Sequence, residues 1–340
     1  MNAELSNTES VMEEISTEKS SLERLHEFSK EIQKECKDFM VREVSDRNMI
    51  FIPDRGSLYF KTGSGKYEYG MSRFSMGQLC TKLEVPSRYI ETCIRKGELE
   101  LASQNVNTWL AQYERDLFVR THKNKVRGIL SNRYMTLDAP EIIETLIENV
   151  PEQFEVKGHY LTSERFHCRI VNKAQMTKKE DLFAGLQIDS SDVGRSMLTV
   201  TFFIFKLVCT NGMVAPVKGG VFYSQKHIGK SADELDEFKL GFKEAMKRLP
   251  EVEEEYFNLI ENAREQKMKL KLEELKNMLL KSSGLNEKGV EGVLQKINAG
   301  QYDNTWWGVI NAVTEASQMY TLERRLEIER AAGNMLMNIA

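Results

Sequence analysis

The run MLTVTFFIFKLVC, residues 197–209, is the feature that most constrains the fold of this chain. It is rich in β-branched and aromatic residues, as expected of a strand that is buried on both faces. Lys206 interrupts the run, which is too short to span a bilayer. The run therefore predicts a central buried strand, and no membrane segment is expected.

Further strands are predicted on the N-terminal side of this run. The segment LFVRTHKNKVRGILSNRYMTLD, from Leu117, contains two strand-like runs around a Lys-Asn-Lys turn. Ala139-Pro140 then opens an apolar-periodic helix, with proline at a favoured first position. Residues 154–171 alternate like a second hairpin, and residues 49–75 contain strand-like runs separated by tight turns.

Both ends of the chain have helical periodicity. Apolar residues follow a spacing of three and four near the N-terminus, at Leu22, Leu25, Phe28, Ile32, Cys36 and Phe39. Ser231, with Glu234 three residues later, predicts the start of a helical C-terminal region. One face of its last section carries Trp307, Ile310, Val313 and Thr314, which predicts a helix docked on the body or on another subunit.

These patterns predict an α+β protein with a central antiparallel or mixed β-sheet and helical N-terminal and C-terminal arms. The expected divisions are a polar helical region over residues 1–47, a β-rich core over residues 48–230 with hairpins and short helices, and a helical region over residues 231–340. Within the core, residues 75–97 read as two short helices broken near Glu84–Ser87. This spacing resembles a helix-turn-helix, but any pair of packed helices produces it.

Composition places the chain among ordinary folded proteins. Its 340 residues carry 47 basic and 51 acidic side chains, a formal net charge of −4. Its five cysteines lie far apart without a Cys-x-x-Cys pair, so a reducing compartment is expected. The first residues lack the basic start and apolar run of a signal peptide, and we expect a cytoplasmic protein.

No motif for catalysis stands out. The five histidines are scattered, and neither a Gly-x-Ser-x-Gly elbow nor a phosphate-binding Gly-Lys-Ser/Thr loop is present. Cys209 ends an apolar strand, where packing is the usual role of a thiol. An open alternative is a cation site formed by Asp181, Asp189 and Asp192 near Arg195. We therefore expect no cofactor, and binding is favoured over catalysis.

A basic and aromatic middle section supplies the candidate site. Single-strand binders combine a cationic groove with rings on which bases stack. Lys123, Lys125 and Arg127 would share one face of a hairpin if the turn preserves the strand alternation. An ordinary solvated hairpin has the same spacing. The predicted nucleic-acid-binding residues are Arg115, Arg120, Lys123, Lys125, Arg127, Arg133, Tyr134, Arg165, Arg169, Lys206, Lys218 and Lys226.

Three segments carry a family resemblance. They are VRTHKNKVRGILSNRYMTLDAPEIIETL, LVCTNGMV and WWGVINAVTE, in this order within residues 75–335. Together they resemble the phage- and plasmid-borne family called domain of unknown function nine-three-two. The resemblance implies a mobile-element protein of a prokaryotic cell. By analogy with single-strand annealing proteins, it also implies a homo-oligomer that binds single-stranded DNA without ATP.

Two functions from different classes remain open at this point. The first is a non-enzymatic nucleic-acid-binding protein of recombination or replication, in which basic side chains neutralise phosphates and Tyr134 stacks on a base. The second is an interaction protein that inhibits or redirects a host defence or replication complex. It would bind a host protein through its helical arms and an exposed Trp306–Trp307 pair.

Overall fold

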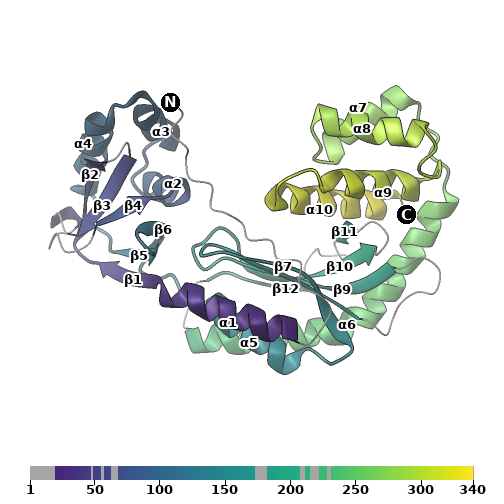
Figure 1. The fold of residues 1–340 in the computed structure, drawn as a ribbon, viewed down its shortest axis with the longest axis horizontal. Coiled ribbons are helices and arrows are strands. Elements are labelled where there is room, and N and C mark those ends of the chain that lie inside the picture. Colours follow the sequence, from purple (N-terminus) through teal and green to yellow (C-terminus); the bar gives the residue numbers. More distant parts are fainter. Residues whose placement is uncertain are drawn as a thin grey trace.

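The computed structural model describes residues 20–46, 49–54, 57–62, 68–172, 182–206, 211–214, 222–227 and 231–339. The predicted α+β class is confirmed, although the strands form two sheets and not one. Each sheet has its own hydrophobic cluster. The two sheets define two lobes that lie side by side and are linked along one side by α1, Ser20–Lys34, and α5, Ala139–Asn149 (Figure 1).

The first lobe contains a mixed sheet in the order β1-β5-β6-β4-β3-β2. Its strands pair antiparallel except for β4 and β6, which are parallel. The strands are β1 Cys36–Val41, β2 Met49–Asp54, β3 Ser57–Thr62, β4 Glu68–Met71, β5 Leu117–His122 and β6 Lys125–Ser131. The helices are α2 Arg73–Lys82, α3 Ser87–Lys96 and α4 Leu99–Leu110, with a short 3-10 turn at Val44–Asp46.

The short helices α2 and α3 confirm the two helices predicted around Glu84–Ser87. Leu79 of α2 and Ile90 of α3 are fully buried in the first-lobe core. Helix α4 lies against the edge strand β2. There Asn107 accepts a hydrogen bond from Phe51 N at 2.8 Å, and its amide donates to Phe51 O at 2.8 Å. Ser103 donates to the same carbonyl, so side chains satisfy polar groups that an edge strand would otherwise expose.

The second lobe contains an antiparallel sheet in the order β11-β10-β9-β8-β7, with β12 also paired to β10. Its strands are β7 Phe154–Leu161, β8 Phe166–Asn172, β9 Leu182–Ser190, β10 Leu198–Lys206, β11 Asn211–Val214 and β12 Tyr223–Gln225. The predicted hairpins are confirmed as β5–β6 and β7–β8. The buried strand predicted over residues 197–209 is confirmed as β10 over Leu198–Lys206, whereas residues 207–209 lie outside the described residues. Phe202 and Phe203 point to opposite faces of β10, and both are fully buried.

The two faces of the second sheet differ in character. One face contributes Cys168 and Ile170 to the main hydrophobic cluster, together with Phe242 of α6. The other face carries Arg169, which forms an ion pair with the buried Glu329 of α10. In Figure 1, α9 and α10 lie on one side of this sheet, whereas α1, α5 and the first part of α6 lie on the other. The C-terminal helices therefore cover a face that is partly polar.

The C-terminal region is helical, as predicted. Its elements are α6 Ser231–Glu265, α7 Leu272–Ser282, α8 Glu287–Asn298, α9 Trp306–Ser317 and α10 Leu322–Ile339. The predicted apolar face of the last section is buried against the body of the protein over α9. The expectation of an exposed aromatic pair is wrong, because Trp307 is buried and Trp306 is half-buried.

The N-terminal helix is shorter than its apolar spacing indicates. Helix α1 ends at Lys34, and Cys36 and Phe39 belong to strand β1. These residues pair with His122 and Val119 of β5, so a sheet contact about eighty residues away overrides the local helical period.

Candidate binding site at the junction of the two lobes

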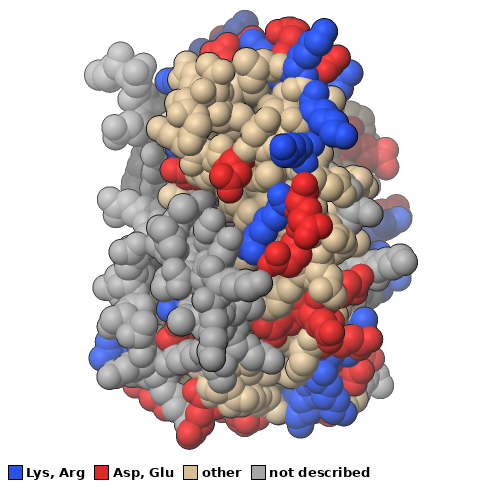
Figure 2. All heavy atoms as spheres, turned by 90° about the vertical axis from the view of Figure 1, so that its right-hand side faces the viewer, with Lys and Arg blue, Asp and Glu red and all other residues tan. Residues whose placement is uncertain are grey.

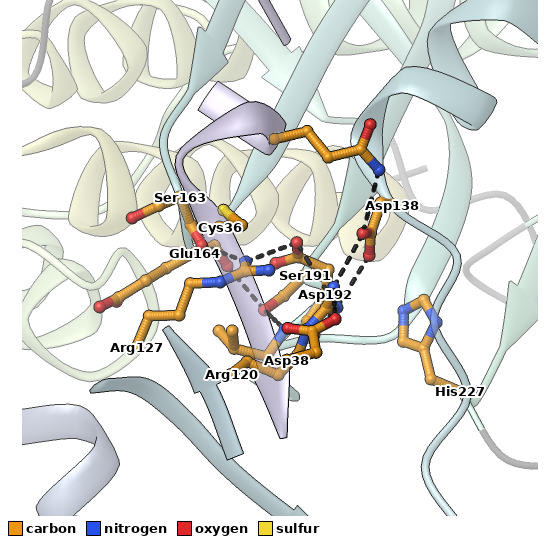
Figure 3. A network of polar contacts seen from close by, with 12 residues as sticks. Cys36, Asp38, Arg120, Arg127, Asp138, Ser163, Glu164, Ser191, Asp192 and His227 are labelled. Atoms are coloured by element: carbon orange, nitrogen blue, oxygen red, sulfur yellow. Dashed lines mark hydrogen bonds and ion pairs between the residues drawn. The ribbon is translucent and has the colours of Figure 1, made fainter. Parts of the chain in front are cut away.

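Arg120 of β5 lies at the centre of a buried polar network between the lobes (Figure 3). Its guanidinium donates five hydrogen bonds, which uses all of its N–H groups. Two go to Asp38 of β1 at 3.1 and 3.0 Å, and two go to Asp138 at 2.8 Å. The fifth goes to the carbonyl of Asp192, in the β9–β10 loop, at 2.8 Å. Arg120 thus joins the first sheet, the start of α5 and a loop of the second sheet.

Arg127 of β6 extends this network. It donates to the Asp192 carboxylate at 2.6 Å and to the carbonyl of Ser163 in the β7–β8 turn. The network holds two guanidinium groups and three carboxylates, so one negative charge is in excess. Burial raises the pKa of Asp192, against the opposing charges of Arg127 and Arg120.

Close packing also joins the β9–β10 loop to the first lobe. The Gln78 side chain accepts from Ile129 N at 2.9 Å and donates to Val193 O at 2.7 Å. A Cβ atom on Gly128 would lie 2.9 Å from Val193 Cβ, so a larger residue does not fit between β6 and the loop. The relative position of the two lobes is therefore fixed by polar bonds and by steric contact.

Three of the predicted phosphate-binding residues are interior residues. Arg120, Arg127 and Arg169 are buried and paired with carboxylates, which corrects the expectation that they are surface cations. The physical reason is that the second lobe covers the strand face on which Arg120 and Arg127 lie. Tyr134 is also engaged, because its hydroxyl donates to Ser191 O at 3.0 Å.

The expected row of three cations is not formed either. Lys123 is exposed but lies in the hairpin turn with a positive φ of 54°, so the alternation of the strand breaks there. Its ammonium group pairs with Glu35 at 3.3 Å. The other predicted residues whose side chains lie at the surface are Arg115, Lys125, Arg133 and Lys226. The Lys206 side chain and all of Lys218 lie outside the described residues.

An open pocket of about 500 Å³ lies where α2 and α3 meet the β9–β10 loop. Its lining includes Arg73, Phe74 and Gln78 of α2, Glu91 of α3, and Arg195. The Arg195 guanidinium lies over the Phe74 ring, 4.3 Å from its centroid, as in a cation–π contact. The Arg73 side chain is 72% exposed and makes a two-bond ion pair with Glu91. Both lobes thus contribute arginines to one concave surface.

Arg165 extends this basic surface along the second lobe. Arg165 of the β7–β8 turn and Arg195 both donate to Glu323, in the first turn of α10, at 3.1 and 3.2 Å. Arg195 also donates to Glu164 at 2.9 Å. Tyr160 lies beside this group, where burial and the charge of Glu323 raise its pKa. We call Arg73, Phe74, Arg165, Arg195 and Glu323 the junction surface.

Sequence reasoning found only part of the junction surface. Arg165 was predicted, and Arg195 was noted only beside the candidate cation site. Arg73 and Phe74 were missed, although Ser72 is an N-cap signal that places both residues in the first turn of α2.

The alternative cation site is not formed by the acids that the structure describes. Asp189 accepts hydrogen bonds from His167 at 2.8 Å and Gln187 at 2.6 Å, whereas Asp192 pairs with Arg127. Asp181 lies outside the described residues. Among the side chains that are described, no group of three or more His, Cys, Asp or Glu is placed to hold a metal ion.

The thiols of Cys36, Cys80 and Cys168 are poorly suited to nucleophilic chemistry. Burial raises the pKa of Cys36 and of Cys80 to about 11, and that of Cys168 to about 12. Thiols with such pKa values are protonated near neutral pH, whereas the thiolate is the reactive form. Cys209 lies outside the described residues.

The fold and the junction define an α+β protein of two sheets, in which buried arginines join the lobes and one arginine from each lobe lines an open pocket. The chain belongs to the family described as Domain of unknown function (DUF932), whose model matches residues 126–335. The predicted family resemblance is therefore confirmed, over a range that begins at β6 and not near residue 75. Neither the curated proteins nor the solved structures yielded a match. Over the residues described, no helix combines the length and the apolar character needed to cross a membrane.

Proposed function

We propose that this protein binds single-stranded nucleic acid without catalysing a reaction, and that the strand lies along the junction surface. The observation that carries the proposal is the pocket that Arg73, Phe74 and Arg195 line together, with the Arg195 guanidinium over the Phe74 ring. Cations spaced around an aromatic ring are what a single strand needs, since phosphates bind the cations and bases stack on rings. A volume near 500 Å³ is also in the range of small-ligand pockets, enough for about one nucleotide.

The ion pairs of the junction surface support this proposal because the Arg73–Glu91 pair and the pairs made by Glu323 each have one well-exposed partner. Exposed pairs contribute roughly 0–1 kcal/mol, so a phosphate can replace a carboxylate at little cost. Arg73 and Glu91 form such a pair. The pairs of Arg120 and Arg127 differ, because separating a buried pair costs about 3–5 kcal/mol. Burial therefore favours the junction surface over the hairpin as the place where phosphates bind.

The distribution of charge elsewhere is consistent with a local site. On the face seen in Figure 2, the acidic and basic side chains of the described residues are interleaved and form no continuous basic area. The formal net charge is −4. Binding would therefore depend on the short-range field of the junction surface, and we expect it to weaken steeply as salt increases.

The finer expectations from the sequence remain proposals. They are a role in recombination or replication of a phage or plasmid, strand annealing, a homo-oligomeric assembly and a cytoplasmic location. A second candidate function, binding of a host protein, is favoured by apolar side chains on the C-terminal helical region. Leu240 of α6 is 70% exposed, and Met319, just after α9, is 80% exposed.

The test of nucleic-acid binding is fluorescence anisotropy with labelled oligothymidylate and a duplex of equal length, over a salt series. Arg73→Ala should weaken single-strand binding about fivefold, because one phosphate contact contributes on the order of 1 kcal/mol. Arg95→Ala is the matched control, since it removes an exposed charge of α3 that does not line the pocket.

The same assay compares the pocket with the hairpin. Lys123→Glu combined with Lys125→Glu reverses two exposed charges of the β5–β6 hairpin. A loss of binding in this variant, with unchanged binding by Arg73→Ala, would move the site from the junction surface to the hairpin. If the wild-type protein binds neither probe at low salt, the proposed function is wrong and a protein partner becomes the better candidate.

A further inference from the structure

Glu323 occupies an unusual position in the junction surface. A single carboxylate oxygen, Oε1, accepts from Arg165 Nη1 at 3.1 Å and from Arg195 Nη1 at 3.2 Å. The two arginines come from the β7–β8 turn and the β9–β10 loop, whereas Glu323 comes from α10. Three segments that are distant in sequence therefore meet at one anionic oxygen.

The solvent-exposed fractions of the three side chains show which of them can move out of the group. The Glu323 side chain is 58% exposed, whereas those of Arg165 and Arg195 are 20% and 29% exposed. Arg195 is also held by Glu164 and by the ring of Phe74, and Arg165 is the least exposed of the three side chains. The carboxylate is the outermost member of the group and can move into solvent without uncovering the core.

The chemistry of the arginine pair fits a phosphate as well as a carboxylate. Guanidinium groups bind both through charge-assisted hydrogen bonds, and two of them converging on one oxygen is an arrangement that a phosphate oxygen accepts. Arg165 Nε is buried and donates no hydrogen bond within the described part of the chain. A phosphodiester carries one negative charge, so exchanging it for Glu323 leaves the net charge of the group unchanged.

We propose that Glu323 occupies the position of a backbone phosphate and competes with the nucleic-acid strand for Arg165 and Arg195. The first turn of α10 is then an internal competitor, and a bound strand displaces the Glu323 side chain. This inference rests on the proposed function, and it assigns the junction surface a second phosphate position beyond the one at Arg73.

The experiment compares Glu323→Gln with Glu327→Gln. Both substitutions remove one negative charge from α10, and Glu327 is 59% exposed and paired with Arg324 instead of the arginine pair. Glu323→Gln should bind labelled oligothymidylate about three- to tenfold more tightly than wild type, because two weak exposed pairs no longer compete. Glu327→Gln should stay within about twofold of wild type, because the Glu327 carboxylate is exposed, pairs with Arg324 and contacts neither Arg165 nor Arg195.

A double variant locates the effect. If the gain arises at the arginine pair, Arg165→Ala should reduce it to the part that is due to Arg195, so that Glu323→Gln raises the affinity less in the Arg165→Ala background than in wild type. Thermal melting of each variant checks that the fold is retained.

The outcomes separate the inference from the proposed function. If wild type binds and Glu323→Gln equals Glu327→Gln, the competitor is refuted and nucleic-acid binding stands. If wild type does not bind detectably but Glu323→Gln does, the competitor is supported directly. If wild type and all variants fail to bind, the proposed function is wrong and the inference falls with it.

Discussion

Replacing Arg120 by lysine tests whether the junction network is held by geometry or only by charge. Lysine keeps the positive charge but offers three N–H donors in place of five, and it cannot bind two carboxylates through paired bonds. In the protein, all five donors of Arg120 are used, four of them by Asp38 and Asp138. At least two charge-assisted hydrogen bonds must therefore be lost in Arg120→Lys.

The expected cost follows from these lost bonds. A hydrogen bond to a charged group contributes about 1.5–3 kcal/mol, so two of them contribute about 3–6 kcal/mol. The Asp38 side chain is 34% exposed, and water can replace part of its bonding, whereas Asp138 is nearly buried. We therefore expect Arg120→Lys to lower the free energy of unfolding by about 3 kcal/mol, near the lower end of this range.

Urea unfolding followed by circular dichroism measures this difference, and the denaturant slope shows whether unfolding remains a single transition. Arg73→Lys is the matched control for stability. Arg73 also makes a two-bond pair with a carboxylate, but in an exposed position, so its loss should change stability by less than about 0.5 kcal/mol. A loss below about 1 kcal/mol in Arg120→Lys would refute the view that paired guanidinium bonds hold the lobes together.

Two further predictions concern the interior of the second lobe. Burial raises the pKa of Glu253 to about 7 from 4.5, so its folded form favours the proton and stability falls as pH rises through this range. Glu253→Gln should therefore stabilise the protein by up to about 3 kcal/mol near pH 8 and little near pH 4.5, as checked by urea unfolding at both values. Gly185→Ala should cost about 1–3 kcal/mol, because its Cβ would overlap the carbonyl of Ile170 and lie 2.9 Å from the Phe203 ring. Gly158→Ala, with nothing within 4 Å, is its control in thermal melting, and equal melting temperatures would contradict this reasoning.

Sequence patterns predict the helices and strands that are determined by the local sequence. The β10 strand, the two hairpins and the C-terminal helices follow from β-branched runs, turn residues and helical periodicity. The pairing of β1 was not predictable in the same way. Its residues continue the apolar spacing of α1, and only the contact with β5 decides that they form a strand.

The roles of the arginines depended on information that local patterns do not contain. Arg120 and Arg127 lie in a hairpin that is polar enough to be solvated. Their partner Asp192 is 72 and 65 residues away in sequence. A register shift between Arg120 and Thr121 also disturbs the alternation of β5, so the face of each side chain cannot be counted from the turn. Only the packing of the second lobe shows that these cations are interior.

The buried and the exposed arginines are connected through the geometry of the junction. The junction surface takes Arg73 and Phe74 from one lobe and Arg165 and Arg195 from the other. The spacing between phosphate positions is therefore set by the contacts that hold the lobes together. A shift of the β9–β10 loop relative to α2 would separate Arg195 from Phe74. The buried network thus matters for binding although it touches no ligand, since it keeps two sets of cations at a distance that one strand can bridge.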